Sequence, residues 1–267
     1  MLSPDQIKAR DGKLTASRVA VLMAGDSLAD QQKINDLWRE MIGDPDYVEE
    51  SLDHIWAVQL GSATEQLQLD WMERRTGRKV TRRGEVVVNP VVDWAACTLD
   101  GWIEDSETVI ECKHVGGFEP REKIVARYLP QVHWQMFVTG ARQCILSIIE
   151  GAREPAHEVI DYDEAYAAEL VERATAFMLC VLTMTPPVAL PAVAPPVKAE
   201  TVYDMQGNNA FASNAVAWSV NRAAAKDFAA AEKTLKSLVP ADAAKCTGYG
   251  IRITRSKAGS LSIREGS

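Results

Sequence analysis

The residues best suited to chemistry lie between positions 94 and 115, in the stretch WAACTLDGWIEDSETVIECKHV. Two runs rich in Val, Ile, Trp and Thr, 94–103 and 108–115, flank a polar stretch and predict a β-hairpin. Asp100 is expected on the first strand and Glu111-Cys112-Lys113 on the second. Because side chains alternate along a strand, Glu111 and Lys113 share one face and Cys112 points to the other.

A bend at Gly101 would bring the Asp100 carboxylate beside Glu111 and Lys113. Two carboxylates and an ammonium gathered at the end of a sheet need further compensation, which a hard divalent cation supplies. The pattern therefore indicates a metal-dependent phosphodiesterase site. The spacing alone is equally compatible with a strand-end turn and a solvated cross-strand pair.

Composition limits the class of protein. A chain of 267 residues with 47% hydrophobic and 25% charged residues is globular, with room for one sizeable core and an appended unit. It contains no apolar run of about 20 residues and begins without the apolar segment of a signal peptide, so we expect a cytoplasmic protein without membrane contact. Five scattered cysteines with no CxxC pair argue against a disulfide framework and against zinc or iron–sulfur sites.

Net charge is −8, which is unfavourable for a nucleic-acid binder, but net charge conceals local fields. The run RRTGRKVTRR at 74–83 holds six basic residues and no acidic one. It is a candidate local basic field.

Two helices are expected to position the site. Gly12–Ser17 is typical of a turn that enters a helix with Thr15 as N-cap, and such a helix start suits an anion; simple capping is the alternative. A second helix is predicted over 55–75, ending at Thr76-Gly77. Its small residues in GSATE would allow close approach to a sheet, so that Glu65 points at the hairpin; a solvated Glu65 is the alternative.

The remaining pattern predicts alternating strands and helices for residues 1–185. One or two strands are expected over 78–92, a helix over 121–139 in which Pro130 either kinks it or begins a new first turn, a strand over 142–149 and a helix over 161–184. Tyr128, Gln131 and Gln135 fall on one face of the 121–139 helix. Gln side chains there would hold a phosphate or a metal-bound water, or form plain surface.

The C-terminal part is of different composition. Residues 186–198 are Pro-rich and predict a stiff linker or wrapping segment. An Ala-rich helix over 210–238 and a basic hairpin over 247–264 follow. This tail is a candidate nucleic-acid or partner surface, or a solvated accessory helix.

The succession LTAS, GSATE, WAACTLDG, IECK and YLPQVHWQMFVTG resembles the YqaJ-type viral recombination nucleases, the family of phage lambda exonuclease within the PD-(D/E)XK superfamily. The resemblance runs from about Arg10 to Pro187. It implies an α/β nuclease core with a central mixed β-sheet flanked by helices. Residues 1–185 would form the exonuclease domain, 186–198 a Pro-rich linker, and 199–267 a C-terminal helix-plus-hairpin extension.

The resemblance also implies roles for individual residues. Asp100, Glu111, the backbone carbonyl of Cys112 and Glu65 match the metal site, and Lys113 matches the catalytic lysine. Residues matching the pocket for a 5′-terminal phosphate and DNA are Arg10, Ser17, Thr98, Lys113 and Gln131, with Tyr128 and Gln135 beside them. Thr98 stands where the family has serine, and Leu99 stands where the superfamily has proline before the aspartate.

The implied activity is that of a 5′→3′ exonuclease dependent on one or two Mg²⁺ ions, with Mn²⁺ as a substitute. It would degrade one strand of linear duplex DNA from 5′-phosphorylated ends and leave 3′ overhangs for a single-strand annealing protein. The expected assembly is a homotrimer, encoded by a phage or prophage and acting in the bacterial cytoplasm. The alternatives are a PD-(D/E)XK endonuclease or RecB-type nuclease, and a catalytically silent scaffold that binds DNA ends.

Overall fold

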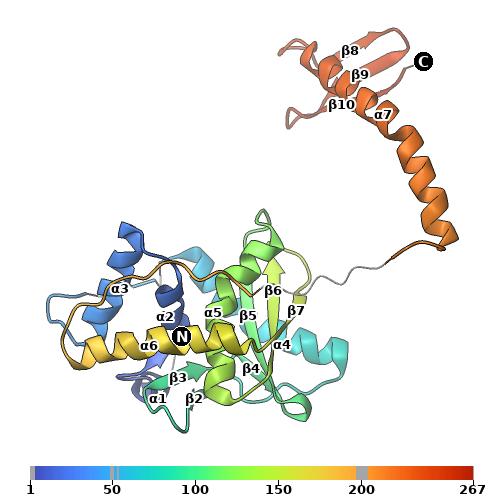
Figure 1. Cartoon of the computed structure of the whole chain (residues 1–267). Coiled ribbons are helices and arrows are strands. Elements are labelled where there is room, and N and C mark those ends of the chain that lie inside the picture. Colours follow the sequence, from blue (N-terminus) through green and yellow to red (C-terminus); the bar gives the residue numbers. More distant parts are fainter. Residues whose placement is uncertain (1–3, 49–50, 53, 197–203, 267) are drawn as a thin grey trace. The chain divides into compact units, whose positions relative to one another are not determined.

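A computed structural model describes residues 4–48, 51–52, 54–196 and 204–266 (Figure 1). The chain divides into two units, Met1–Lys198 and Ala199–Ser267. No helix in the described ranges is long and apolar enough to cross a membrane.

The described residues of the N-terminal unit form two small sheets. The larger has the order β4 (Gly101–Ile103), β5 (Thr108–Val115), β6 (Gln143–Glu150) and β7 (Ala156–Asp161). Strands β5 and β6 run parallel and the other neighbours antiparallel, so the predicted mixed sheet is confirmed. The smaller sheet has the order β1 (Leu14–Thr15), β3 (Ala95–Thr98) and β2 (Val86–Val88).

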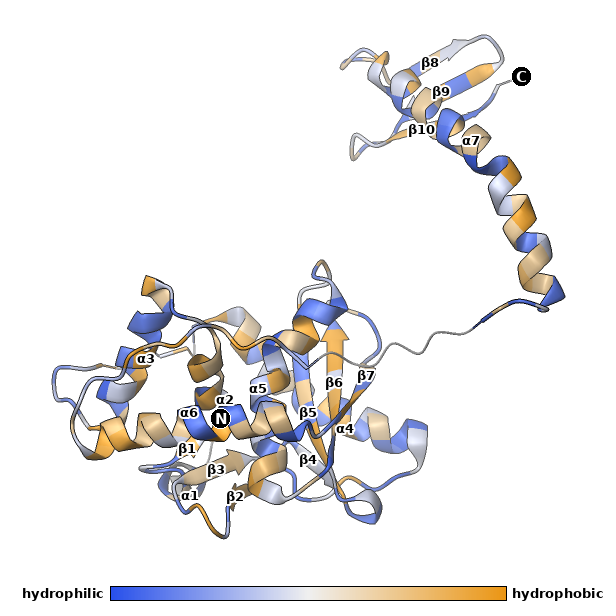
Figure 2. Cartoon of the chain, viewed as in Figure 1, coloured by the Kyte–Doolittle hydropathy of each residue, from blue (hydrophilic) through white to orange (hydrophobic). Residues whose placement is uncertain are grey.

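Helices cover both faces of the larger sheet. On one face α4 (Trp56–Thr76) packs on β5, and its Leu69 and Met72 join Ile110 and Cys112 in a small apolar cluster. On the other face lies α5 (Arg121–Thr139), which also contacts β3. The hydrophobic colouring of β6 in Figure 2 reflects its burial between these layers. The other helices of this unit are α1 (Pro4–Ala9), α2 (Ala16–Val19), η1 (Ala20–Met23), α3 (Leu28–Met41), η2 (Glu104–Ser106) and α6 (Glu164–Leu182).

Helix α5 ties the two sheets together. The indole of Trp134 is fully buried and its Nε1 donates a hydrogen bond to the Ala96 carbonyl of β3 at 3.0 Å. Pro130 lies within α5, which runs from Arg121 to Thr139 without interruption, so it does not begin a new helix. Burial of the indole contributes several kcal/mol, since truncation of a buried Trp costs about 3–5 kcal/mol. This buried contact fixes the position of α5, and with it the side chains that the helix directs toward the two sheets.

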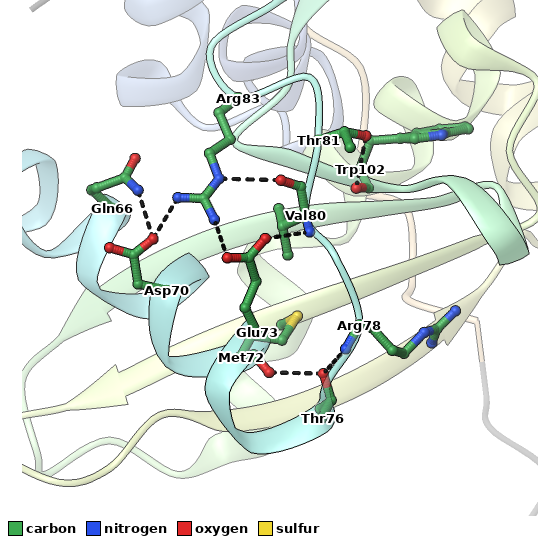
Figure 3. A network of polar contacts seen from close by, with 10 residues as sticks. All are labelled: Gln66, Asp70, Met72, Glu73, Thr76, Arg78, Val80, Thr81, Arg83 and Trp102. Atoms are coloured by element: carbon green, nitrogen blue, oxygen red, sulfur yellow. Dashed lines mark hydrogen bonds and ion pairs between the residues drawn. The ribbon is translucent and has the colours of Figure 1, made fainter.

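The end of α4 is fastened to the segment that follows it (Figure 3). The guanidinium of Arg83 lies 2.6 Å from Asp70 and 3.1 Å from Glu73, both on α4. Glu73 also accepts a hydrogen bond from the Val80 N–H at 2.7 Å. Gly77 closes the helix with a φ of 71°, a conformation in which glycine carries little strain.

The expectation of one continuous strand over 94–103 is wrong. The chain breaks at Leu99 and Asp100, so that β3 and β4 belong to different sheets. The backbone of Leu99 pairs with the Glu85 carbonyl and the Gly84 N–H, at 2.9 and 2.8 Å, instead of with β5. Over 78–92, the described strand is β2 alone, and β7 has no counterpart in the prediction.

The first part of the Pro-rich segment lies along the N-terminal unit. Gln31 of α3 donates to the Pro187 carbonyl at 3.0 Å and accepts from the Ala189 N–H at 2.9 Å. Arg173 of α6 donates to the Pro191 carbonyl at 2.9 Å. These residues therefore wrap around the unit.

Within residues 204–266, the described part of the C-terminal unit, there are one helix and three strands. Helix α7 (Asn209–Ser237) is followed by β8 (Lys245–Gly248), β9 (Ile251–Arg255) and β10 (Leu261–Glu265). The sheet order is β10-β9-β8, and both pairings are antiparallel. The expected helix and hairpin are present, and β8 adds a third strand.

Candidate active site

The break between β3 and β4 brings three charged groups together. Asp100 lies in the break, and its Oδ2 accepts a hydrogen bond from the Cys112 N–H of β5 at 2.7 Å. Glu111 and Lys113 project from one face of β5, with Lys113 Nζ 2.5 Å from Glu111 Oε1. Cys112 points to the opposite face, against α4. The predicted alternation along this strand is therefore present.

Glu111 is the deepest of these groups, with 2% of its surface exposed. Its Oε1 accepts hydrogen bonds from Lys113 Nζ and Gln131 Nε2, each at 2.5 Å, and its Oε2 accepts one from Gln135 Nε2 at 2.5 Å. The two glutamines lie four residues apart on one face of α5. A buried carboxylate requires such donors, because its loss of hydration is otherwise uncompensated.

The electrostatics reflect three carboxylates near one ammonium. Burial raises the pKa of Asp100 well above its usual value, and the charges of Glu111 and Glu65 raise it further. Burial and Glu111 likewise raise the pKa of Glu65. Burial alone would lower the pKa of Lys113, but Glu111 and Asp100 outweigh it and the pKa lies above its ordinary value. Lys113 is therefore a fixed positive charge.

A cavity of about 750 Å³ contains this cluster. Glu65 of α4 lies at its wall, half-buried, across from the groups on β5. The sequence-predicted residues that line the same cavity are Arg10, Ser17, Glu65, Thr98, Asp100, Glu111, Cys112, Lys113, Tyr128 and Gln131. Gln135 is the exception, because it is fully buried beneath Glu111.

Hydroxyl and guanidinium groups line another part of the cavity wall. Arg10 donates to Thr15 Oγ1 at 3.3 Å, and that oxygen lies 3.5 Å from Ser17 Oγ. Thr98 Oγ1 is buried and has no hydrogen-bond partner in the described residues. Donors of this kind match the oxygens of a phosphate.

Thr15 precedes α2 as expected, but its side chain makes no capping hydrogen bond. Because α2 has only four residues, its dipole adds little to anion binding. Sequence reasoning treated Thr15 as a cap and did not place it in the site. The sequence analysis also did not include His114, which lines the cavity and whose Nδ1 lies 3.1 Å from Thr64 Oγ1. Its place directly after Lys113 in the sequence could have suggested it.

The donor set fits a divalent cation in charge and chemistry. Asp100, Glu111 and Glu65 are hard oxygen donors, and like charge raises the pKa of two of them: Glu111 raises the pKa of Glu65, and Glu111 and Glu65 raise that of Asp100. The Glu65 carboxylate forms no hydrogen bond or ion pair with the side chains or backbone of the described residues. No group of three or more His, Cys, Asp and Glu side chains in the described ranges already has metal-ligand geometry. Both oxygens of Glu111 accept hydrogen bonds from Lys113, Gln131 and Gln135.

The basic run at 74–83 is largely neutralised within the chain. Arg75 lies 3.5 Å from Glu154, Arg78 lies 2.7 Å from Asp105, and Arg82 pairs with Glu85. Arg83 pairs with α4, as Figure 3 shows. The expected local basic field is therefore reduced by these carboxylates.

The fold and the site define an α/β enzyme of the nuclease class. The model of the YqaJ-like viral recombinase domain matches residues 6–142, about half of the chain, and the protein belongs to that family. The predicted family membership is confirmed.

Two solved structures show a similar fold. An alkaline exonuclease from Laribacter hongkongensis has 23% sequence identity and a TM-score of 0.56, covering 68% of this chain and 94% of its own. A phage-related exonuclease from Haemophilus somnus 129PT has 13% identity and a TM-score of 0.52, covering 64% and 94%. A search of curated proteins gives no match.

Proposed function

We propose that this protein is a DNA exonuclease that hydrolyses one strand of linear duplex DNA in the 5′→3′ direction, starting at 5′-phosphorylated ends. The observation that carries the proposal is the single cavity shared by the Asp100, Glu111 and Lys113 cluster and the donors Arg10 and Ser17. Hydrolytic groups and an anion pocket in one cavity favour cleavage next to a terminal phosphate. Family membership and the names of the two structural neighbours support the same class of reaction.

Asp100, Glu111, the Cys112 carbonyl and Glu65 are the groups that would hold one or two Mg²⁺ ions, with Mn²⁺ as a substitute. When bound, such ions lower the pKa of water and neutralise charge on the scissile phosphate and the leaving oxygen.

The chain's own residues orient the substrate. Lys113, fixed by Glu111 and lying 4.9 Å from the centre of the Tyr128 ring, places a positive charge toward the phosphate that is cleaved. Gln131 holds Glu111 at the cavity surface. Arg10, Ser17 and Thr98 would bind the terminal phosphate and so set the polarity.

The biological role follows from this polarity. Removal of one strand leaves a 3′ overhang, the substrate of a single-strand annealing protein in recombination. We include in the proposal a homotrimer that encloses the duplex and a phage-encoded enzyme working in the cytoplasm of the bacterial host. An acidic chain is compatible with this assembly, because a ring can be basic inside and acidic outside.

The test is digestion of a linear duplex in Mg²⁺, with and without 5′-phosphate, beside a closed circle. We expect loss of the 5′-phosphorylated strand alone and an intact circle. Cutting of the circle would identify an endonuclease, and no hydrolysis of either would identify a scaffold.

Two variants test the assigned roles. Lys113→Ala should abolish hydrolysis while calorimetry still detects Mg²⁺ binding. Arg10→Ala should reduce the preference for 5′-phosphorylated ends. A Lys113→Ala protein with wild-type turnover, or an Arg10→Ala protein with an unchanged preference, contradicts the corresponding role.

A further inference from the structure

One face of the C-terminal sheet carries only polar and basic side chains. In the strand register Thr254 lies opposite both Lys245 and Ser262, and Arg252 lies opposite both Thr247 and Arg264. Residues opposite one another project from the same face of a sheet. The hydrogen-bond distance of 2.9 Å between Thr254 Oγ1 and Ser262 Oγ agrees with this. We define the outer face as Lys245, Thr247, Arg252, Thr254, Ser262 and Arg264.

The opposite face is apolar at its centre, with Arg255 and Glu265 toward its ends. It carries Cys246, Ile253 and Ile263, which lie opposite one another, and Ile253 is buried. The outer face is therefore the one turned to solvent, and Lys245, Thr247, Ser262 and Arg264 on it are exposed.

The basic groups on the outer face are unpaired. Arg252 and Arg264 lie directly opposite each other, an arrangement in which like charges destabilise a sheet. In the described part of the chain no carboxylate pairs with either arginine or with Lys245. Most arginines of the N-terminal unit, such as Arg83 and Arg121, do have carboxylate partners.

The C-terminal unit also differs from the rest of the chain in net charge. Residues 199–267 contain nine Lys and Arg against six Asp and Glu, a net charge of +3, within a chain whose net charge is −8. An unpaired basic face in an acidic protein is complementary to a polyanion, whose phosphates would relieve the repulsion between the arginines.

An exposed aromatic residue lies at the tip of the same sheet. Tyr249 and Gly250 form the two-residue turn between β8 and β9, with φ angles of 49° and 76°. Both angles are left-handed, as in a type I′ turn, where Asn and Gly are the favoured residues and tyrosine is costly. The Tyr249 side chain is fully exposed. The exposed aromatic ring offers a flat surface on which an unpaired base can stack.

We propose that the outer face of the C-terminal sheet binds single-stranded DNA, through phosphate contacts to Lys245, Arg252 and Arg264 and stacking of a base on Tyr249. Three strands spaced about 4.8 Å apart make a face wide enough for one nucleic-acid backbone and narrower than a duplex. Stacking requires an unpaired base, which favours a single strand over a duplex. This binding is independent of the proposed nuclease function. If the protein is the proposed exonuclease, the single strand that digestion leaves is a ligand for this face, and only this use rests on that function.

The test is fluorescence anisotropy with the full chain in EDTA and a labelled 20-nucleotide oligo-dT that lacks a 5′-phosphate. Each lost contact to a single strand reduces the slope of log K against log salt by about 0.7, so the double variant Arg252→Ala/Arg264→Ala should lose about 1.4. Its affinity should fall about tenfold or more at physiological salt. Tyr249→Ala should weaken binding about tenfold, while Tyr249→Phe should bind as the wild type does.

The matched control is Lys226→Ala/Lys233→Ala, which removes the same charge from α7 instead of from the strands. The proposal is overturned if the control loses as much affinity for oligo-dT as Arg252→Ala/Arg264→Ala does. It is also overturned if the face variant loses as much affinity for duplex DNA as for oligo-dT, or if Tyr249→Ala binds oligo-dT as tightly as the wild type. Should the double variant fail to fold, Arg264→Gln on the edge strand should still reduce the slope by about 0.7. A wild-type protein that digests no DNA would overturn the proposed nuclease function and leave this binding result standing.

Discussion

Replacement of Gln135 by leucine tests how the protein stabilises its buried carboxylate. The Gln135 amide is fully buried, and its Nε2 donates to Glu111 Oε2 at 2.5 Å and to the Thr98 carbonyl at 3.3 Å. Leucine has a similar size and no donor, so the variant leaves Glu111 Oε2 without its hydrogen bond. The position supports a role in positioning Glu111 rather than in contacting DNA.

The magnitude follows from the contacts. A hydrogen bond to a charged group contributes about 1.5–3 kcal/mol to the free energy of unfolding. Leucine also removes the Gln135 Oε1, which is buried without a partner in the described residues, and this offsets about 1 kcal/mol. The net loss is about 0.5–2 kcal/mol. For a unit of this size it lowers the Tm by about 1–8 °C.

The matched control is Gln131→Leu. Gln131 donates to Glu111 Oε1, but Lys113 donates to the same oxygen and water in the cavity can replace the amide. The control should therefore cost less than 1 kcal/mol. Thermal and denaturant unfolding in EDTA measure both variants. If Gln131→Leu costs as much as Gln135→Leu, the buried amide does not hold Glu111.

Three further variants test the surrounding structure. Burial lowers the pKa of His133 below 6.5. The unfolded chain therefore binds a proton that the folded chain does not, and stability falls as the pH falls. His133→Gln should flatten the pH dependence of the unfolding free energy between about pH 7 and 5, and an unchanged slope would contradict this. Gly101→Ala would place a Cβ 2.6 Å from Val80 Cγ1 and should cost about 1–3 kcal/mol in denaturant unfolding, whereas an unaltered midpoint would refute the close packing. Arg83→Ala should cost about 1 kcal/mol at low salt and less in about 1 M NaCl, because its ion pair with Asp70 is partly exposed; a loss that salt does not change argues against it.

Local pattern was sufficient for the long elements. The apolar spacing and the terminal Gly77 predicted α4 to within one or two residues, and α5 lies at its predicted bounds. The alternation along β5 placed Glu111 and Lys113 on one face, because residues two apart in an extended strand project to the same side.

Features that depend on distant partners were not accessible from the sequence. The ion pairs of Arg75 with Glu154 and of Arg78 with Asp105 join residues far apart in the chain, so a run of basic letters gave no sign of them. The contact of Gln135 with Glu111 depends on how closely α5 approaches β5. A helical face of polar residues does not distinguish such a buried amide from surface.

The break at Asp100 connects the wrong prediction for 94–103 to the chemistry of the site. Since Gly101 lies opposite Ile110, a ladder continued toward β3 would place Leu99 opposite Cys112 and pair their backbones. Instead Leu99 pairs with Gly84 and Glu85, and the Asp100 carboxylate accepts the Cys112 N–H in place of a strand carbonyl. The backbone group is satisfied, and a carboxylate is held against β5 at the end of the hairpin. The group that replaces the strand carbonyl is a carboxylate. The break in the strand therefore places the Asp100 carboxylate close enough to Glu111 and Glu65 for their charges to raise its pKa.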